Sequence, residues 1–220
     1  MQNSSITDFA SGLTTLGALA LIVFSNREWP PSTHRKLHAA VGKAIAREAV
    51  SLLGHGGQIT VIARDTETFK QPAAEIQLNS FKEEIRRSNA TIGAAQFLQV
   101  DPLRPVEVPP GDFFELIRKA PVRNVIVSFM GPPLLSEEQR GQLGTVKPRV
   151  VAFCPGSVAG SIDLRALFDQ QLLHAAVVSR RNSGRSPPGD KGLADSFDRL
   201  YMSVTAANLA SLPDPTESPR

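Results

Sequence analysis

The 220-residue sequence contains one cysteine, one tryptophan, one tyrosine and four histidines. A single cysteine excludes an internal disulfide, and with four widely spaced histidines it does not form the cluster that a soft metal ion needs. The 24 basic residues nearly balance the 21 acidic ones. No aromatic residues are interleaved with the basic ones, so the pattern of a nucleic-acid-binding surface is missing. We therefore expect no metal, no cofactor and no nucleic acid.

The short motifs that hold nucleotides or activate a serine are also missing. The first predicted strand runs into the sequence ARDTETF, which has no glycine where a dinucleotide-binding turn needs one. There is no P-loop pattern, and PGSVAG at 155–160 does not have the spacing of a hydrolase nucleophile elbow. Aromatic residues make up only 6% of the chain. Because sugar-binding clefts commonly present aromatic faces, this scarcity argues against a sugar site.

One apolar segment stands out in a chain whose 41% hydrophobic content is ordinary for a globular protein. Phe9–Asn26 carries no charge, and 18 helical residues span about 27 Å, close to the core of a bilayer. Arg27, Arg35 and Lys36 follow it, and such charges favour the cytoplasmic side. We interpret residues 1–27 as a single-pass anchor in the cell membrane. The alternative is a helix buried against the domain, and the side of the membrane that the domain faces stays open.

Beyond this segment, helical and strand patterns alternate. We expect an amphipathic helix and a turn over 28–56, an α/β domain over 57–212 and a disordered tail over 213–220. Short apolar runs predict strands at 59–63, 91–100, 122–129, 149–153 and 175–179. Helical spacing predicts helices at 34–53, 72–89, 112–119, 136–143, 162–173 and 193–212, with Asp112 as an N-cap and Ser136 with Gln139 as a capping box. The alternation predicts a doubly wound parallel sheet of about five strands, ordered 2-1-3-4-5 and flanked by helices.

Ligands of such sheets bind beyond the carboxyl ends of the strands, so the residues that follow each strand are candidates for a site. No nucleophile–base pair occurs among them, and we assign no catalytic residue. The candidate ligand-binding residues are Arg64, Asp65 and Thr66 after the first strand, Ser128 and Gly131 after the third, and Gly156 and Ser157 after the fourth.

Two other interpretations remain open. An enzyme of the same fold would use Cys154 as a nucleophile, or an anion site at Gly156–Ser161 before the next helix. A structural subunit would associate through an exposed sheet edge, or through the apolar residues Leu200, Val204 and Leu209 of the last predicted helix.

Three stretches together resemble one lobe of the type I periplasmic binding proteins, the sugar- and amino-acid-binding components of transporters. They are GQITVIARDTETFKQPAAEIQLNSFKEEI, VRNVIVSFMGPPLL and KPRVVAFCPGSVAGSIDLRALFDQQLLHAAVVSRR, and they cover residues 57 to 181. The resemblance implies a ligand-binding lobe outside the cytoplasm. Members of that family close two lobes over a ligand, whereas this chain has room for one. It is therefore similar to a membrane-anchored bacterial relative with a single lobe.

These observations lead to one functional hypothesis. The chain is a non-catalytic, membrane-anchored α/β module that binds a small polar ligand or a protein partner at the carboxyl ends of its strands.

Overall fold

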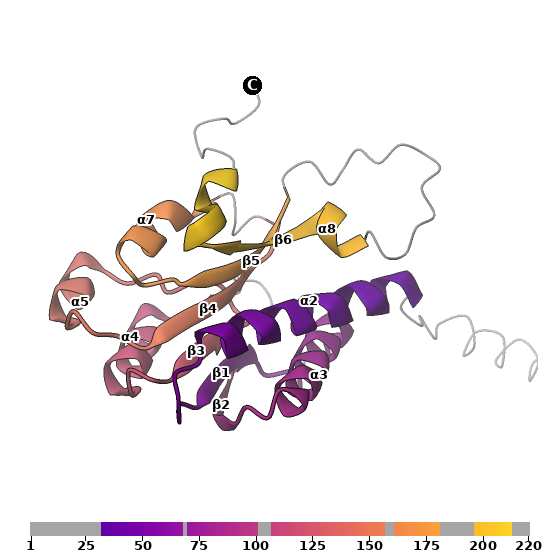
Figure 1. The fold of residues 1–220 in the computed structure, drawn as a ribbon, viewed down its shortest axis with the longest axis horizontal. Coiled ribbons are helices and arrows are strands. Elements are labelled where there is room, and N and C mark those ends of the chain that lie inside the picture. The colour runs from indigo at the N-terminus through magenta and orange to yellow at the C-terminus, as the bar shows by residue number, and fades with distance from the viewer. Residues whose placement is uncertain (1–31, 68–69, 101–106, 157–160, 181–195, 213–220) are drawn as a thin grey trace, which may run out of the picture. The chain divides into compact units, whose positions relative to one another are not determined.

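In the computed structural model the described residues are 32–67, 70–100, 107–156, 161–180 and 196–212, and they contain a single mixed sheet (Figure 1). Its strands are β1 (Ile59–Arg64), β2 (Ile92–Leu98), β3 (Val125–Ser128), β4 (Arg149–Cys154), β5 (Ala175–Ser179) and β6 (Tyr201–Thr205). They are ordered β2-β1-β3-β4-β5-β6. The first five pair in parallel, and β6 pairs antiparallel with β5. This confirms the doubly wound α/β fold and the order of the five predicted strands.

The helix predicted over 193–212 is wrong. The chain there forms a short helix α8 (Ser196–Leu200), then β6, then a 3₁₀ segment η1 (Ala206–Ser211). The sequence YMSVT of β6 is rich in aromatic and β-branched residues, which pack well on a pleated sheet. Pairing with β5 also satisfies backbone groups that β5 would otherwise leave open. Tertiary pairing thus overrides the helical spacing of the apolar residues.

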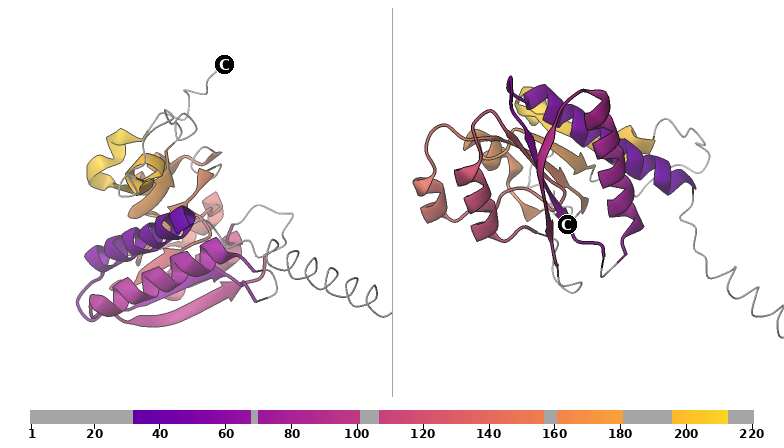
Figure 2. Two further views of the ribbon diagram at one scale, coloured as in Figure 1. Left: turned by 90° about the vertical axis from the view of Figure 1, so that its right-hand side faces the viewer. Right: turned by 90° about the horizontal axis from the view of Figure 1, so that it is seen from below.

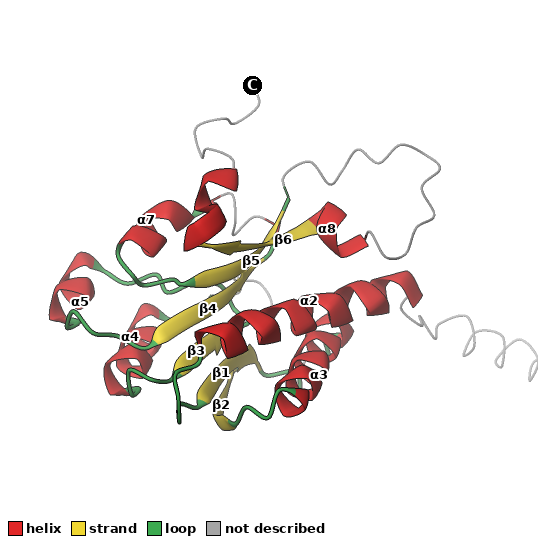
Figure 3. Ribbon diagram, in the orientation of Figure 1, coloured by secondary structure: helices red, strands yellow, loops and turns green. Residues whose placement is uncertain are grey.

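The helix α2 (Ser32–Leu52) precedes β1. The helices between the parallel strands are α3 (Pro72–Arg87), α4 (Pro110–Lys119), α5 (Glu137–Gln142) and α7 (Leu164–Asp169), so that helices and strands alternate along the chain (Figure 3). Two starts differ from expectation. Pro109 is the N-cap of α4, so Asp112 lies inside the first turn. Asp163 caps α7 by accepting from Ala166 N–H at 3.0 Å. The predicted capping box of α5 is present, with Ser136 and Gln139 bonded to each other's backbone N–H groups.

Two hydrophobic clusters cover the two faces of the sheet. On one face α2 and α3 pack against the strands through residues such as Ile45 and Phe81, and on the other α4 and α7 pack through residues such as Phe113 and Leu167. Figure 2 shows α2 and α3 lying side by side. No helix among the described residues is long and apolar enough to cross a membrane. The predicted anchor, Ser157 and the tail from 213 lie outside the described residues.

A glycine sets the distance between α2 and α3. At Gly42 a Cβ atom would overlap the backbone carbonyl of Gln77, which belongs to the facing helix. Because backbone atoms cannot move aside as a flexible side chain can, any larger residue at this position must push the two helices apart. The helix pair that covers one face of the sheet is therefore held by backbone-to-backbone contact.

We expect Gly42→Ala to destabilise the chain by about 2 kcal/mol or more, because overpacking a tight contact forces backbone shifts. Urea unfolding followed by circular dichroism measures this change. The matched control is Gly141→Ala in α5, where an added Cβ meets nothing within 4 Å, and there we expect no loss and a gain of up to about 1 kcal/mol from helix propensity. Equal effects at the two positions would contradict the close contact.

Candidate functional site

A cavity of about 780 Å³ opens at the carboxyl ends of the strands, on the face that α2 and α3 cover. Its volume lies in the range of small-molecule sites. Its walls come from α2, the end of β1 and the loop that follows, α3, β2, the segments after β3 and β4, and the start of β6. The lining residues are His38, Ala63, Arg64, Asp65, Thr66, Glu67, Lys70, Gln71, Ala73, Ala74, Glu75, Gln77, Leu78, Asn79, Lys82, Phe97, Phe129, Phe153, Pro155 and Tyr201.

The register of the parallel strands explains the floor of the cavity. Ile62 pairs with Ser128, and Ser128 pairs with Ala152. The next residue on each of these strands therefore lies on the opposite face, the one toward α2 and α3, because side chains alternate along a strand. This row contains Ala63, Phe129 and Phe153, and it continues to Phe97, the partner of Ala63 on β2. Ala63 lies between Phe97 and Phe129 in this row, and its small side chain leaves space that a larger side chain would fill.

Aromatic side chains form one wall of this space. Phe129 meets Phe81 edge-on, with ring centroids 5.5 Å apart, and Tyr201 lies 5.8 Å from Phe153 and 5.9 Å from Phe197. Burial raises the pKa of the Tyr201 hydroxyl, although a hydrogen bond with Ser179 acts in the opposite direction. The hydroxyl therefore stays neutral at physiological pH. The chain has few aromatic residues, but four of them border this cavity, so the composition argument against a sugar site does not hold at this position.

Polar groups from β1 and the following turn also line the cavity. The Asp65 carboxylate accepts a hydrogen bond from Glu67 N–H at 2.8 Å, and the Arg64 guanidinium donates to the carbonyl of Val100 at 3.4 Å. Thr66 follows them in the same wall. These contacts fix the turn after β1, and they hold the Asp65 carboxylate beside the cavity.

A polar pair from the two covering helices completes the lining. Gln77 is only 7% exposed and lies 3.3 Å from His38 through Nε2 and Nδ1. A buried amide is costly unless it is hydrogen-bonded, so this pairing explains how α3 carries a glutamine on its inner side. The close contact at Gly42 lies on the same helix pair and positions both residues.

The charged residues of the lining balance one another. Three are cationic and three anionic, and they are Arg64, Lys70, Lys82, Asp65, Glu67 and Glu75. A site for a phosphate or another strong anion would carry an excess of positive charge. The balance favours a neutral or zwitterionic ligand.

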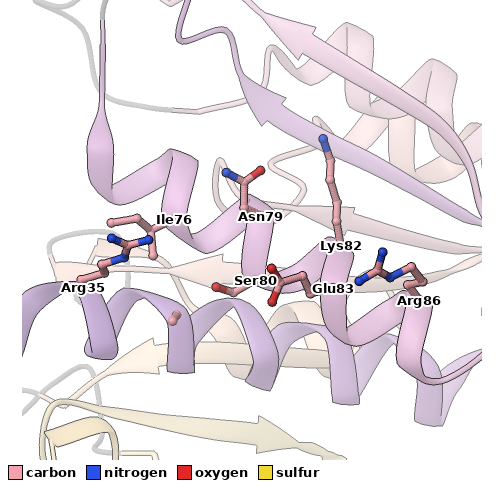
Figure 4. Close-up of a pocket in the computed structure, with 8 residues that line it drawn as sticks. Arg35, Ile76, Asn79, Ser80, Lys82, Glu83 and Arg86 are labelled. Carbon is pink, nitrogen blue, oxygen red and sulfur yellow. The ribbon is translucent and has the colours of Figure 1, made fainter.

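A second hollow of about 590 Å³ runs along the outer side of α2 and α3 (Figure 4). It shares Asn79 and Lys82 with the cavity. Ser80 and Glu83 are directed toward α2 in this view, whereas Lys82 points away from it. The Lys82 ammonium lies 5.9 Å from the centre of the Phe97 ring, within the range of a cation–π contact. Lys82 therefore belongs with the β2 side of α3.

The structure brings together some of the predicted site residues and separates others. Arg64, Asp65 and Thr66 line the cavity. Ser128 is fully buried and its hydroxyl accepts from Met130 N–H at 3.2 Å, while Gly131 is buried with a φ of 92°. These two shape the turn after β3 and do not line the cavity. Gly156 is exposed, has a φ of 42° and donates its N–H to Ser179 Oγ at 2.9 Å.

Sequence reasoning missed most of the lining. The sequence analysis chose polar residues that follow β3 and β4, whereas Phe129 and Phe153 line the cavity. The alternation of side chains along the paired strands, which puts both phenylalanines on one face, could have identified them. Nothing in the sequence indicated that His38 and Gln77 would line the cavity, because the sequence does not tell which turn of a covering helix lies at the carboxyl ends of the strands. Tyr201 was assigned to a helix.

Cys154 lies in the core and not in the cavity. Its side chain is buried in the cluster beneath α4 and α7, and burial raises the pKa of its thiol to about 12. Since the thiolate is the nucleophile, the thiol is unreactive near neutral pH. The structure therefore gives no support to an enzyme that uses Cys154.

Alkylation measures this directly. At pH 8 we expect iodoacetamide to modify Cys154 in the folded chain at least about 100-fold more slowly than in guanidinium, because both the high pKa and burial suppress attack. The unfolded chain is the internal control, since it contains the same single thiol. Equal rates in the two states would show that the thiol is accessible and would return Cys154 to the candidates.

Comparisons with known proteins agree with the fold. No protein-family model matches the sequence, and no curated protein is similar to it in sequence. Among solved structures, the arabinose binding protein AraP from Geobacillus stearothermophilus aligns with a TM-score of 0.51 and 15% identity, over 80% of this chain and 63% of that one.

Two further structures align at lower similarity. The sugar-binding protein of a sugar ABC transporter from Bacillus halodurans gives a TM-score of 0.49 and 11% identity, over 80% of this chain and 64% of that one. The periplasmic component of an ABC-type sugar transport system from Hahella chejuensis gives 0.45 and 15%, over 64% of this chain and 49% of that one. The chain thus spans less than two thirds of these proteins, and its fold is that of one lobe of the type I periplasmic binding proteins.

Proposed function

We propose that the chain binds a small, neutral, polyhydroxylated ligand, a monosaccharide, in the cavity at the carboxyl ends of its strands. One observation carries the proposal. The cavity joins an aromatic wall to a wall of fixed polar groups, and its charges balance. Binding needs no catalytic group, and this agrees with a buried Cys154 whose thiol stays protonated.

Each wall suits one part of such a molecule. Phe129, Phe153 and Tyr201 line the cavity, and their apolar surface suits the C–H face of a sugar ring. The Asp65 carboxylate offers an acceptor for hydroxyl groups, and hydrogen bonds to charged groups are the stronger kind. The likeness in fold to an arabinose binding protein makes pentoses the first ligands to try, although fold alone does not transfer function.

The ligand proposal is tested by thermal unfolding of the chain with a panel of pentoses, hexoses, amino acids and phosphate. A ligand at 100 times its Kd adds about 2.7 kcal/mol of stability, which is roughly 5–10 °C in Tm for a chain of this size. We expect a shift of this order from at least one monosaccharide and none from phosphate. A shift from phosphate alone, or none from any sugar, would contradict the proposal.

The matched variants are Asp65→Asn and Glu137→Gln. Asp65→Asn keeps an oxygen that can accept from Glu67 N–H, but it removes the charge, and we expect about 10- to 100-fold weaker sugar binding from the loss of a charge-assisted bond. Glu137 is an exposed carboxylate in the first turn of α5, and its change should leave the affinity unaltered. Titration calorimetry compares the two, and unchanged affinity in Asp65→Asn would remove Asp65 from the site.

We further propose that Phe9–Asn26 anchors the chain in the cell membrane. The support is its length, its lack of charge and the basic residues Arg27, Arg35 and Lys36 that follow. We expect the full chain to stay with membranes in alkaline carbonate and to leave them in detergent. Leu19→Asp combined with Ile22→Asp should release it, since each charge at the centre of a span costs about 3 kcal/mol. Release of the unaltered chain by carbonate would contradict an anchor.

A further inference from the structure

The two edge strands of the sheet, β6 and β2, differ in how their outer backbone groups are bonded. On the β6 edge the side-chain amide of Asn208 donates to the carbonyl of Ser203 at 2.9 Å, and its oxygen accepts from Thr205 N–H at 2.7 Å. The side chain thus bonds to the outer backbone groups of β6 much as another strand would. Edge strands need such protection, because their open backbone groups invite pairing with another chain.

At the β2 edge, on the opposite side of the sheet (Figure 1), the described residues offer no comparable protection. The five central residues of its sequence IGAAQFL are exposed, and the strand contains no charged residue and no proline. Leu98 directs its carbonyl inward, where it accepts from Asp65 N–H at 2.8 Å. Because this direction alternates along a strand, Ala95 and Phe97 direct their N–H and carbonyl groups outward.

The side chains on this edge suit close contact with another strand. Phe97 is 50% exposed, a large apolar surface for an edge position. The small residues Gly93, Ala94 and Ala95 precede it, so another backbone can approach without steric hindrance. Partly exposed aromatic residues of this kind are typical anchors at the centre of protein interfaces.

The helix beside β2 carries charges in an order that complements a copy of itself. A groove of about 420 Å³ separates β2 from α4, and it is lined by Gln96, Phe97, Leu98, Asp112, Glu115, Leu116 and Lys119. Asp112 lies in the first turn of α4 and Lys119 in the last, where the Lys119 ammonium also lies 3.0 Å from the Glu115 carboxylate of the same helix. A two-fold axis through Phe97, in the middle of the β2 part of this groove, would set Asp112 of each copy toward Lys119 of the other. Such self-complementarity is what a two-fold interface requires.

We propose that β2 is the interface between two copies of this chain. The two β2 strands pair antiparallel about an axis at Phe97, so that Phe97 exchanges both backbone hydrogen bonds with its counterpart and Ala95 faces Gln99. The two sheets then form one continuous sheet, with the two α4 helices side by side and their opposite charges facing. This interface does not depend on the proposed ligand.

Disulfide trapping tests the register. Phe97→Cys places a thiol at the two-fold axis, where we expect rapid formation of a covalent dimer on mild oxidation, read on a non-reducing gel of the full chain in detergent. The native Cys154 is buried and does not compete. The control is Val146→Cys, at a residue that is 68% exposed and remote in sequence from β2. If Phe97→Cys forms dimers no faster than Val146→Cys, the proposed register is wrong.

Sedimentation equilibrium of the full chain in density-matched detergent tests the interface itself. We expect a dimer whose dissociation constant rises at least 10-fold in Phe97→Lys and is unchanged in Val146→Lys. Asp112→Lys and Lys119→Asp should each weaken the dimer, and the double variant should recover it. Circular dichroism confirms that each variant is folded. A monomer at all concentrations, or a dimer that survives Phe97→Lys, overturns the proposal.

Discussion

The parallel pairing of β1, β3 and β4 is the constraint on which the cavity depends. Each helical crossover returns the chain to the same end of the sheet, so that all three strands run in the same direction and their carboxyl ends lie together. The register then places Ala63, Phe129 and Phe153 in one row on one face. A shift of one residue in any of these strands would exchange its inner and outer faces. In β3, a shift by one residue toward the carboxyl end would replace the phenylalanine of the row by Ser128, and in β4 a shift in the opposite direction would replace it by Cys154.

The covering helices turn this row into a site. The contact between Gly42 and the backbone of Gln77 brings α2 and α3 close together, and this closeness permits the contact between the buried Gln77 and the partly buried His38. The turn after β1 supplies Asp65, whose carboxylate is held by Glu67 N–H. The apolar lining thus arises from strand register, whereas the polar lining arises from helix packing and from the turn after β1.

The sequence predicted most of the architecture, because continuous apolar runs and helical spacing are local signals. The strand at 175–179 and the capping box at Ser136 and Gln139 are confirmed at the expected positions. The last strand was missed because Val204 fits the spacing of a helix as well as that of a strand, and only its pairing with Ala176 on β5 decides between them.

The site was less predictable than the fold. The rule that ligands bind at strand ends pointed to Arg64, Asp65 and Thr66, and these residues line the candidate cavity. It also pointed to Ser128, whose hydroxyl accepts from Met130 N–H within its own turn and does not line this cavity. The low aromatic content of the chain did not indicate the aromatic wall, because composition does not say where residues lie in the fold. Four aromatic side chains at one edge matter more than their low share of the chain.

Tyr201 offers the most direct measurement of ligand binding in the cavity. It is the one tyrosine of the chain and it lines the aromatic wall, so a chain labelled with 3-fluorotyrosine has a single ¹⁹F resonance that reports on this position. Titration with the monosaccharide that raises Tm should move this resonance in a saturable way, with the same Kd as calorimetry. A resonance that stays unchanged while the sugar binds would place the ligand elsewhere and contradict the account.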